Sequence, residues 1–370
     1  MSFLPHDLHL EILKRLPPLP HVLASASVVC KAWHGVVNDP SFLRELYRAR
    51  GAAPVTLGFF HNSDDLPHMF VPAGEPASFD HGCYDRRTDW QFVDSRHGRV
   101  LLSDVWDHRF LVWHPMTEER HLVRAKALDM PEAPDGNNQV GAALICDCAT
   151  EDGEGDQGQR PACHASPFRV AVVFRHPEDD TMLASVFSSL TGQWCRMLEL
   201  PLVWKVRSEP CTVVGNVLYQ QLVECRILAF DTDLRTLTTL HRPRCGNVRL
   251  LKMDGGVLGL AGVQGFTLHL WARDADADDW VLLKTVNLKE IIPGLSAAPS
   301  PKTDPRFTAM PVVKIIGVTE EGDALFLWTM IGIFMLGTES MELMKVHGTA
   351  VDKMKTVYPY ASFYLPAAGW

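Results

Sequence analysis

The sequence predicts a small all-α unit of three to four short helices over residues 1–50, followed by an all-β, propeller-like domain of five or six blades over residues 51–370. Apolar residues follow helical spacing in the first fifty residues, and such spacing is scarce afterwards. From about Val55 on, short apolar runs alternate with Gly, Pro, Asp and Asn, a pattern typical of strands joined by tight turns. A strand and turn unit recurs in this second part, which indicates stacked blades.

The first helix is expected directly after the segment Leu4-Pro5-His6-Asp7. Four apolar side chains share one helical face: Leu8, Ile12, Leu13 and Leu16. Asp7 suits the helix start because its carboxylate can accept hydrogen bonds from backbone N–H groups that lack a partner inside the helix. Pro17-Pro18 ends the helix, since proline has no N–H to donate.

Two or three further short helices are expected before residue 50. One begins near Pro20, the next spans about Val28–Val37 and stops at Asn38-Asp39-Pro40, and the last opens at Pro40. Their apolar positions include Val22, Leu23, Ala26, Phe42, Leu43, Leu46 and Tyr47. A unit this small hides only about 60% of its surface or less. These helices therefore need a hydrophobic partner outside themselves.

Cys30 and His34 lie four residues apart on the third expected helix. The pair could be a nucleophile with its base or two metal ligands. Neither arrangement is complete, because a catalytic dyad needs a third orienting group and a metal site needs more than two ligands. We expect Cys30 to pack as a small buried apolar residue beside a histidine on the helix surface.

Several short blocks follow one another in order between Leu4 and Leu46. They are Leu4-Pro5, Glu11-Ile12-Leu13, Arg15-Leu16-Pro17, Val29-Cys30-Lys31-x-Trp33 and Asp39-Pro40-Ser41-Phe42. With these blocks the segment resembles an F-box. The resemblance implies that residues 1–50 dock on the small Skp-family adaptor, which connects F-box proteins to a cullin ubiquitin ligase.

The same resemblance implies which residues contact the adaptor or pack beneath the contact. They are Leu4, Pro5, Leu8, Ile12, Leu13, Leu16, Pro17, Leu23, Val29, Cys30, Trp33, Pro40 and Phe42. Interfaces of this kind concentrate their energy in a few apolar or aromatic anchors, each costing more than ~1 kcal/mol on truncation. Leu8 and Trp33 are the anchors that we expect to matter most.

The repeated unit of the β region begins with glycine, continues with small or polar residues and leads into an apolar strand. It starts at Gly98, Gly215, Gly256 and Gly322. A repeat near 40 residues with two hairpins is typical of propeller blades. Closure could pair "YASFYL" near the carboxyl end with an early strand such as "VTLGFF", which would leave no open sheet edge. Five tryptophans are expected mainly between blades: Trp113, Trp194, Trp271, Trp280 and Trp328.

The β region also resembles the kelch-like or F-box-associated propellers found behind the F-box in large plant families. The segment "DGGVLGL", Asp254 to Leu260, is similar to the kelch double glycine. This resemblance implies a propeller that binds the target protein of a ubiquitin ligase. The target itself is not indicated.

Charge and composition narrow the class of protein. The net charge is −9, from 35 basic and 44 acidic residues, which argues against non-specific nucleic-acid binding. The longest uncharged run, Ala324–Gly337, is too short to cross a bilayer and fits two adjacent buried strands. Nine cysteines without regular spacing favour a reducing compartment, so we expect a cytoplasmic or nuclear protein that binds no membrane.

No motif of the sequence identifies an active site. Three cysteines and a histidine between Cys146 and His164 suggest a zinc site. Their spacing does not readily wrap a tetrahedral ion. An acidic loop insertion near 147–166 is the better interpretation of this segment. The aspartates of "RDADADDW" (Arg273 to Trp280) lack the Gly and distal Glu of a calcium loop and suit a hairpin tip. We expect no catalytic residue, no cofactor and no metal.

The leading hypothesis is therefore a non-catalytic receptor subunit of a ubiquitin ligase. Two alternatives stay open at this point. One is a propeller enzyme, a hydrolase or oxidoreductase, with the helical unit as an appendage. The other is a scaffold that binds the adaptor and a partner without ubiquitin transfer.

Overall fold

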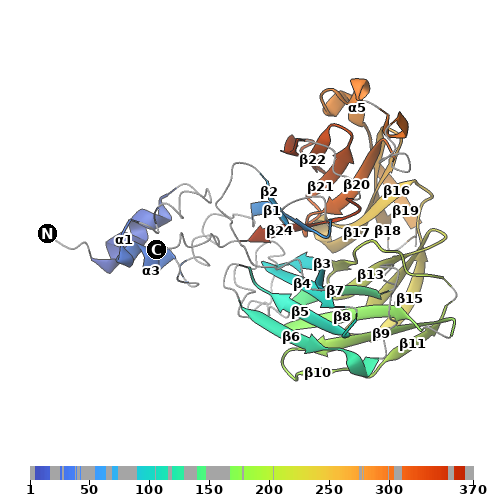
Figure 1. Ribbon diagram of the computed structural model, residues 1–370, viewed down its shortest axis with the longest axis horizontal. Helices are drawn as coiled ribbons and strands as arrows, with labels where there is room; N and C mark the ends of the chain where they lie inside the picture. The colour runs from blue at the N-terminus through green and yellow to red at the C-terminus, as the bar shows by residue number, and fades with distance from the viewer. Residues whose placement is uncertain are drawn as a thin grey trace.

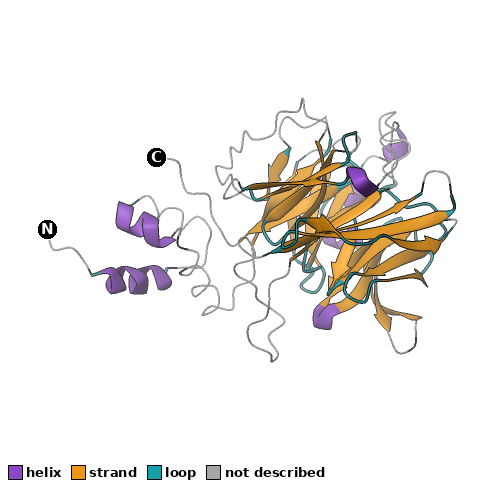
Figure 2. Cartoon of the chain, turned by 90° about the horizontal axis from the view of Figure 1, so that it is seen from below, coloured by secondary structure: helices purple, strands orange, loops and turns teal. Residues whose placement is uncertain are grey.

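The computed structural model shows a small helical unit and six β-sheets arranged in a ring (Figure 1). It describes residues 5–16, 26, 29–37, 39, 42, 55–63, 69–73, 90–104, 106–115, 119–128, 140–146, 167–176, 179–202, 204–274, 277, 279–298, 300–303, 311–348 and 354–362. Viewed from below, the helices again stand to one side of the sheets (Figure 2).

Two helices of the amino-terminal unit are described, α1 (His6–Lys14) and α3 (Lys31–Val37). The Pro5 carbonyl accepts hydrogen bonds from the N–H groups of Leu8 and His9, at 3.1 and 3.3 Å, so the helix starts one residue earlier than Asp7. Ala26 and Phe42 are the helical residues described in the other two predicted helices. The predicted number of three to four helices depends on residues outside those described.

The unit has a small core of its own. Its buried members are Leu13, Ala26, Val36, Val37 and Phe42, with Leu10, Leu16 and Trp33 packed at the edge. The first helix and the third helix thus meet through residues that the helical spacing placed on their inner faces.

Blades 1 to 3 follow in chain order. Blade 1 contains β3 (Trp90–Arg96), β4 (Arg99–Asp104), β5 (Arg109–Trp113) and β6 (Arg120–Arg124). Blade 2 contains β7 (Val140–Cys146), β8 (Phe168–Arg175), β9 (Thr181–Ser188), β10 (Gln193–Trp194) and β11 (Leu198–Pro201), the last two both pairing with β9. Blade 3 contains β12 (Thr212–Val214), β13 (Val217–Leu222), β14 (Arg226–Asp231) and β15 (Thr236–His241).

Blades 4 to 6 complete the ring. Blade 4 contains β16 (Asn247–Met253), β17 (Val257–Gln264), β18 (Thr267–Asp274) and β19 (Asp279–Asn287), followed by the short helix α5 (Leu288–Ile291). Blade 5 contains β20 (Val313–Val318), β21 (Ala324–Thr329), β22 (Gly332–Gly337) and β23 (Leu343–His347). Blade 6 joins β24 (Val357–Ser362) to β1 (Val55–His61) and β2 (Phe70–Pro72).

The ring closes through strands from both ends of the β region. The inner strands β3, β7, β12, β16, β20 and β24 neighbour one another in that order and return to β3. Strand β24 runs antiparallel to β1, from Val55 opposite Ser362 to His61 opposite Val357. This confirms the predicted pairing of "YASFYL" with "VTLGFF". The propeller has six blades, the upper of the two predicted numbers.

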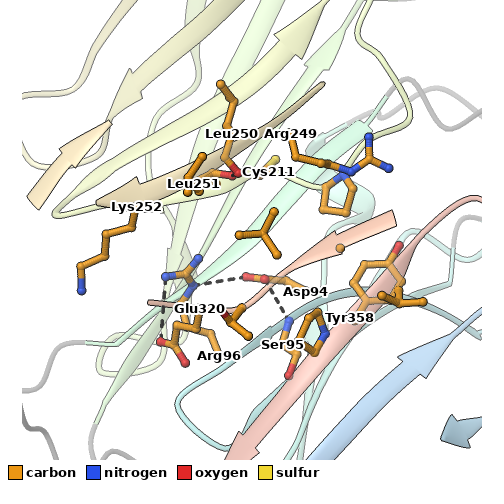
Figure 3. A pocket seen from close by; sticks show the side chains of 17 residues that line it. Asp94, Ser95, Arg96, Cys211, Arg249, Leu250, Leu251, Lys252, Glu320 and Tyr358 are labelled. Atoms are coloured by element: carbon orange, nitrogen blue, oxygen red, sulfur yellow. Dashed lines mark hydrogen bonds and ion pairs between the residues drawn. The ribbon is translucent and has the colours of Figure 1, made fainter. Parts of the chain in front are cut away.

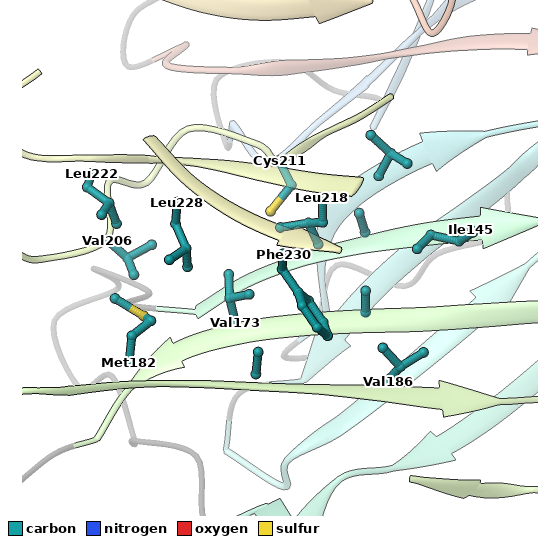
Figure 4. Close-up of a cluster of buried hydrophobic side chains, with 14 of the residues drawn as sticks. Ile145, Val173, Met182, Val186, Val206, Cys211, Leu218, Leu222, Leu228 and Phe230 are labelled. Carbon is teal, nitrogen blue, oxygen red and sulfur yellow. The ribbon is translucent and has the colours of Figure 1, made fainter. Parts of the chain in front are cut away.

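Six hydrophobic clusters fill the six junctions between blades, one cluster at each junction. Figure 4 shows the cluster between blades 2 and 3, where Val173 and Met182 of blade 2 face Leu228 and Phe230 of blade 3. All five tryptophans predicted to lie between blades belong to or pack on such clusters: Trp113, Trp194, Trp271, Trp280 and Trp328. Their inter-blade role is therefore confirmed.

Two further predictions about strands hold. The uncharged run Ala324–Gly337 forms β21 and β22, which pair with each other in blade 5 and are mostly buried. Of the aspartates after Arg273, Asp274 and Asp279 lie opposite each other at the end of the hairpin between β18 and β19, and Asp274 accepts a hydrogen bond from the N–H of Ala277 at 3.2 Å. Asp276 and Asp278 lie outside the described residues.

The repeated glycine has a structural reason that is clearest at Gly322, in the turn between β20 and β21. Its φ is +77°, a left-handed conformation that side chains disfavour. A Cβ at this position would lie 1.8 Å from the backbone oxygen of Lys252 in blade 4. Glycine thus lets the turn of one blade touch the inner strand of the blade before it.

Candidate functional site

The helical unit exposes an apolar surface beside its core. Leu8 and Ile12 lie one turn apart on α1 and are 47% and 38% exposed, and Val29, just before α3, is 63% exposed. Leu13 and Phe42 are buried in the cluster beneath. Exposed leucine, isoleucine and valine at neighbouring helical positions are the type of surface that a second polypeptide covers.

The other predicted adaptor residues divide into four groups. Pro5 is exposed, whereas Leu16 and Trp33 are half-buried at the edge of the core. Leu13 is fully buried, so it supports the exposed face from below and offers no surface of its own. Leu4, Pro17, Leu23 and Pro40 lie outside the described residues.

Cys30 is half-buried at the start of α3, which is less burial than the sequence led us to expect. Its Sγ accepts a hydrogen bond from the N–H of Trp33 at 3.5 Å, a contact that satisfies one of the unpaired N–H groups of the first helical turn. The ring of Trp33 meets that of His9 edge-on, with 6.4 Å between centroids. Cys30 therefore acts in helix capping and packing here.

The inner strands of the propeller surround a narrow central channel (Figure 3). The free space in it is about 60 Å³, room for a few water molecules. Its wall comes from the inner strands of blades 1, 3, 4, 5 and 6. We call the end where the inner strands begin the entry mouth, and the end where they finish the exit mouth.

Glu320 and Arg96 lie at the exit mouth, with Lys252 beside them (Figure 3). One Glu320 oxygen lies 2.7 Å from Nε2 of His97 and 3.9 Å from Nη1 of Arg96. The other accepts the backbone N–H of His97 at 2.8 Å. Burial alone would raise the pKa of Glu320, but His97 and Arg96 outweigh it and lower that pKa to about 2.

Asp94 lies deeper, on β3. Its carboxylate accepts the backbone N–H groups of Leu144 in blade 2, at 2.8 Å, and of Ser95, at 2.9 Å. Nε of Arg96 is 3.7 Å from the same carboxylate. Burial raises the pKa of Asp94, although Arg96 and the two N–H groups oppose the rise. The group serves mainly to tie blade 1 to blade 2.

Glu209 and Arg249 lie at the entry mouth. Glu209 accepts two hydrogen bonds from Arg207, both at 3.0 Å, and lies 3.6 Å from Nη1 of Arg249. Burial opposes ionisation of Glu209, yet the two arginines lower its pKa below the ordinary value. Figure 3 shows Arg249 and Tyr358 at this end of the channel, away from Glu320 and Lys252.

The chemistry available in the channel is limited. Each carboxylate described above is already bound to arginine, histidine or backbone N–H groups. Burial raises the pKa of Cys211 well above its ordinary value, and its thiol donates to Oε1 of Gln220 at 2.8 Å. Burial likewise raises the pKa of Cys146 to about 12. These thiols are the inert kind, since a nucleophilic cysteine requires a lowered pKa.

The described residues contain neither a cluster of metal-ligating side chains nor a membrane-spanning helix. In this part of the chain, no three side chains of the His, Cys, Asp and Glu types converge as a metal site requires. The helices there are all too short or too polar to span a bilayer. The Cys-and-His segment after Cys146 lies outside the described residues.

Sequence reasoning did not single out the charged residues of the channel. One signal could have identified two of them. Arg96 and Glu320 each stand two residues before a repeat glycine, Gly98 and Gly322. That position lies at the end of an inner strand or just after it, where the channel opens. Arg249 and Glu209 carry no comparable mark in the sequence: Arg249 lies within a strand, and Glu209 is bound by Arg207 of its own segment as well as lying near Arg249 of blade 4.

Comparison with known families settles the class of protein. Residues 91–367 match the family described as "F-box protein AT5G49610-like, beta-propeller". The chain belongs to this family. In addition, residues 1–49 match the F-box-like family, so an F-box-like domain precedes the AT5G49610-like propeller. Both resemblances stated from the sequence are thereby confirmed.

Individual relatives of this F-box and propeller chain are plant proteins. An F-box/kelch-repeat protein of Arabidopsis thaliana, At3g17530, is 29% identical over 138 residues, which are 34% of this chain and 34% of the relative. The F-box protein At3g17710 of the same plant is 30% identical over 118 residues, 30% of each chain. The chain thus spans about a third of the length of the curated relatives it matches.

Solved structures give weaker matches. A luciferin-regenerating enzyme has 9% identity and a TM-score of 0.38, covering 71% of this chain and 76% of that one. The WD40 domain of SCAP from fission yeast has 12% identity and a TM-score of 0.37, covering 72% and 53%. Matches at this level carry no information about the function of the F-box protein.

Proposed function

We propose that this chain is the substrate-recognition subunit of an SCF-type, cullin-RING ubiquitin ligase. In this proposal the F-box-like domain binds a Skp-family adaptor and, through it, a cullin. The six-bladed propeller binds the target protein. The chain supplies no reacting side chain, because holding the target near the ubiquitin donor raises the effective concentration of its lysines.

The apolar face of α1 is the observation that carries the proposal. Leu8 and Ile12 are exposed although a formed core lies directly beneath them. Fully burying one such side chain contributes about 1.5–3 kcal/mol. A folded domain that leaves two of them outside, next to exposed Val29, is complete only when a partner covers them.

The channel does not favour the alternative of a propeller enzyme. Ligand sites for small molecules occupy roughly 300–1,000 Å³, whereas the space inside this channel is about 60 Å³. Asp94 and Glu320 are both engaged in bonds between blades. The scaffold alternative differs from the main proposal only in whether ubiquitin is transferred, so an assay of that transfer separates the two.

The proposal also assigns the chain to the cytoplasm, the nucleus or both. The described cysteines include six free thiols, in keeping with a reducing compartment. Imaging of a fluorescently tagged full-length chain would test this assignment.

Co-purification tests adaptor binding. The full-length chain, co-expressed with a Skp-family adaptor and a cullin, should elute as one complex that transfers ubiquitin to co-purified partners. Leu8→Asp should release the adaptor, because an ionised carboxylate at the interface would lose its water. Leu190→Asp is the matched control, since Leu190 is equally apolar and lies exposed in a propeller turn. Retention of the adaptor by Leu8→Asp as strongly as by Leu190→Asp would refute the proposal.

A further inference from the structure

Positive charge is concentrated around the entry mouth of an otherwise acidic protein. Three described segments lead into the inner strands of blades 3, 4 and 6, namely 204–211, 242–246 and 354–356. They contain five basic residues (Lys205, Arg207, Arg242, Arg244 and Lys355) and one acidic residue, Glu209. Arg249 on β16 and Lys314 on β20 add two more positive charges, while the whole chain carries −9.

Arg249 is buried but poorly satisfied. Its guanidinium donates to the backbone oxygens of Val248 and Lys355 at 3.2 and 3.3 Å, and to Oγ1 of Thr356 at 3.4 Å. Nε has no acceptor. The one carboxylate that pairs with it among the described residues, Glu209, is 3.6 Å away and is bound more closely by Arg207. A buried cation that makes only long hydrogen bonds to neutral oxygens can still form stronger hydrogen bonds with an anion.

Lys314 and Arg242 show the same shortage of acceptors. The structure gives the Lys314 ammonium no hydrogen bond or ion pair within the described part of the chain. Burial, with repulsion from Arg249 and Lys355, lowers the pKa of Lys314 to about 8 even though Glu209 opposes the shift. Nε of Arg242 is also buried and meets no acceptor among the residues that the structure describes. Arg242, Arg249 and Lys314 thus share a single carboxylate, Glu209, as far as the described residues go.

The size of the channel limits which group can pair with these cationic side chains. Arg249 lines the channel, whose free space of about 60 Å³ admits one small polar head but no folded segment or nucleotide. A peptide lying across the mouth could insert one side chain. Carboxylates and phosphates match the guanidinium fork and would supply the missing acceptors.

We propose that the entry mouth, formed by Arg207, Arg242, Arg249, Lys314 and Lys355, binds a negatively charged side chain of an acidic peptide segment in the target protein. The inference rests on the proposed function, because it names the chemistry of the target that the propeller would hold. Carboxylate and phosphate groups offer the same oxygen acceptors. The experiment therefore includes both.

Fluorescent peptides of one scaffold test the inference, with a central glutamate pair, phosphoserine, serine or lysine. They are titrated into the full-length chain, purified both alone and after co-expression with a Skp-family adaptor. The glutamate peptide, the phosphoserine peptide, or both should bind at least about tenfold more tightly than the serine peptide. A tenfold difference in affinity corresponds to the free energy of about one hydrogen bond to a charged group. Added salt should weaken this binding. Binding of phosphoserine alone would assign phosphate as the recognised group.

Variants locate the site. Lys314→Met keeps the length of the side chain, and Lys355→Gln changes an exposed residue, so both should fold. Each should reduce affinity for the acidic peptide about tenfold. Lys126→Gln, an exposed residue after the outer strand of blade 1, should leave affinity unchanged. Equal binding by all variants, equal binding of serine and acidic peptides, or tighter binding of a single-stranded oligonucleotide would overturn the inference.

Adaptor binding is measured on the same preparations and separates the two proposals. If the adaptor stays bound while no acidic peptide binds, the entry-mouth inference fails and the proposed function stands. If acidic peptides bind but the adaptor does not, the ligase role fails and the anion site stands.

Discussion

Glu320 and His97 are in contact at the exit mouth although 223 positions separate them in the chain. One carboxylate oxygen accepts the backbone N–H of His97 at 2.8 Å, and the other lies 2.7 Å from its ring Nε2. Glu320 follows the inner strand of blade 5, and His97 follows that of blade 1. The pair therefore joins the two neighbours of blade 6, the blade that closes the ring.

This pair predicts a pH dependence of stability. The pKa of Glu320 is lowered to about 2 from an ordinary value near 4.5. The ionised group therefore stabilises the fold above pH 4.5, by about 3 kcal/mol at most, and this contribution is lost as the pH falls towards 2. Glu320→Gln should be less stable than the wild type at pH 6. Urea unfolding of both proteins should show the difference shrinking between pH 4.5 and 2, and a constant difference would contradict the assignment.

Substitutions of Tyr360 test how the propeller closes at the junction of blades 6 and 1. Its ring is fully buried at the junction of blades 6 and 1, and its hydroxyl donates to the backbone oxygen of Gly98 at 3.2 Å. Tyr360→Phe should cost about 1 kcal/mol, the net worth of one hydrogen bond. Tyr360→Ala should cost about 3–5 kcal/mol because it also leaves a cavity. If thermal unfolding showed similar losses of stability for both variants, packing of the aromatic ring of Tyr360 would contribute little.

Phe230 tests packing between blades. The side chain is fully buried between blades 2 and 3 (Figure 4). Phe230→Ala should lower the free energy of unfolding by about 3–5 kcal/mol. Leu234→Ala, at an exposed turn residue of the same blade, should change it by about 0.5 kcal/mol or less. Urea denaturation followed by tryptophan fluorescence measures both values.

Leu8 and Leu13 should separate binding from folding in the F-box-like domain. Leu13 is buried in its core, so Leu13→Ala should destabilise the domain by about 2–5 kcal/mol. Leu8 is exposed, so Leu8→Ala should leave the helical circular dichroism signal unchanged while adaptor affinity falls by more than ~1 kcal/mol. Calorimetric titration with the adaptor provides the second value. Loss of helical signal in Leu8→Ala would show that its role is structural.

The Lys314 ammonium should titrate near pH 8, the pKa to which burial and its neighbours lower it. Three charged groups act on it: Arg249 of β16, Lys355 before β24 and Glu209 before β12. Competitive acetylation at a series of pH values, read by peptide mass spectrometry, should give this midpoint. Lys355→Gln should raise it, because one repelling positive charge is removed. A midpoint unchanged by that substitution would show that the two groups do not interact.

Features that depend on neighbouring residues could be predicted well. The spacing of Leu8, Ile12 and Leu13 and the break at Pro17-Pro18 indicated α1, which is observed at His6–Lys14. The repeat glycines marked hairpin turns, because only glycine readily adopts the left-handed conformation seen at Gly98 and Gly322. Even the closing pair was foreseeable, since a ring leaves no strand edge unpaired.

The charged sites were not predictable in the same way. Arg249 depends on Glu209, Lys355 and Thr356, which belong to two separate stretches of the chain, both far from Arg249 in sequence. Nothing in the residues next to Arg249 reveals that partners from blades 3 and 6 meet it. The exposed state of Leu8 and the buried state of Leu13 likewise depend on where α3 packs.

Local spacing and turn chemistry in the chain thus specified the kinds of elements, their repetition and the family. Six-fold closure, the pairing of Glu320 with His97 and the gathering of positive charge at one mouth arose only when the blades came together. The reason is physical: backbone preferences act over a few residues, whereas charges interact with whatever the folded ring places within a few ångströms of them.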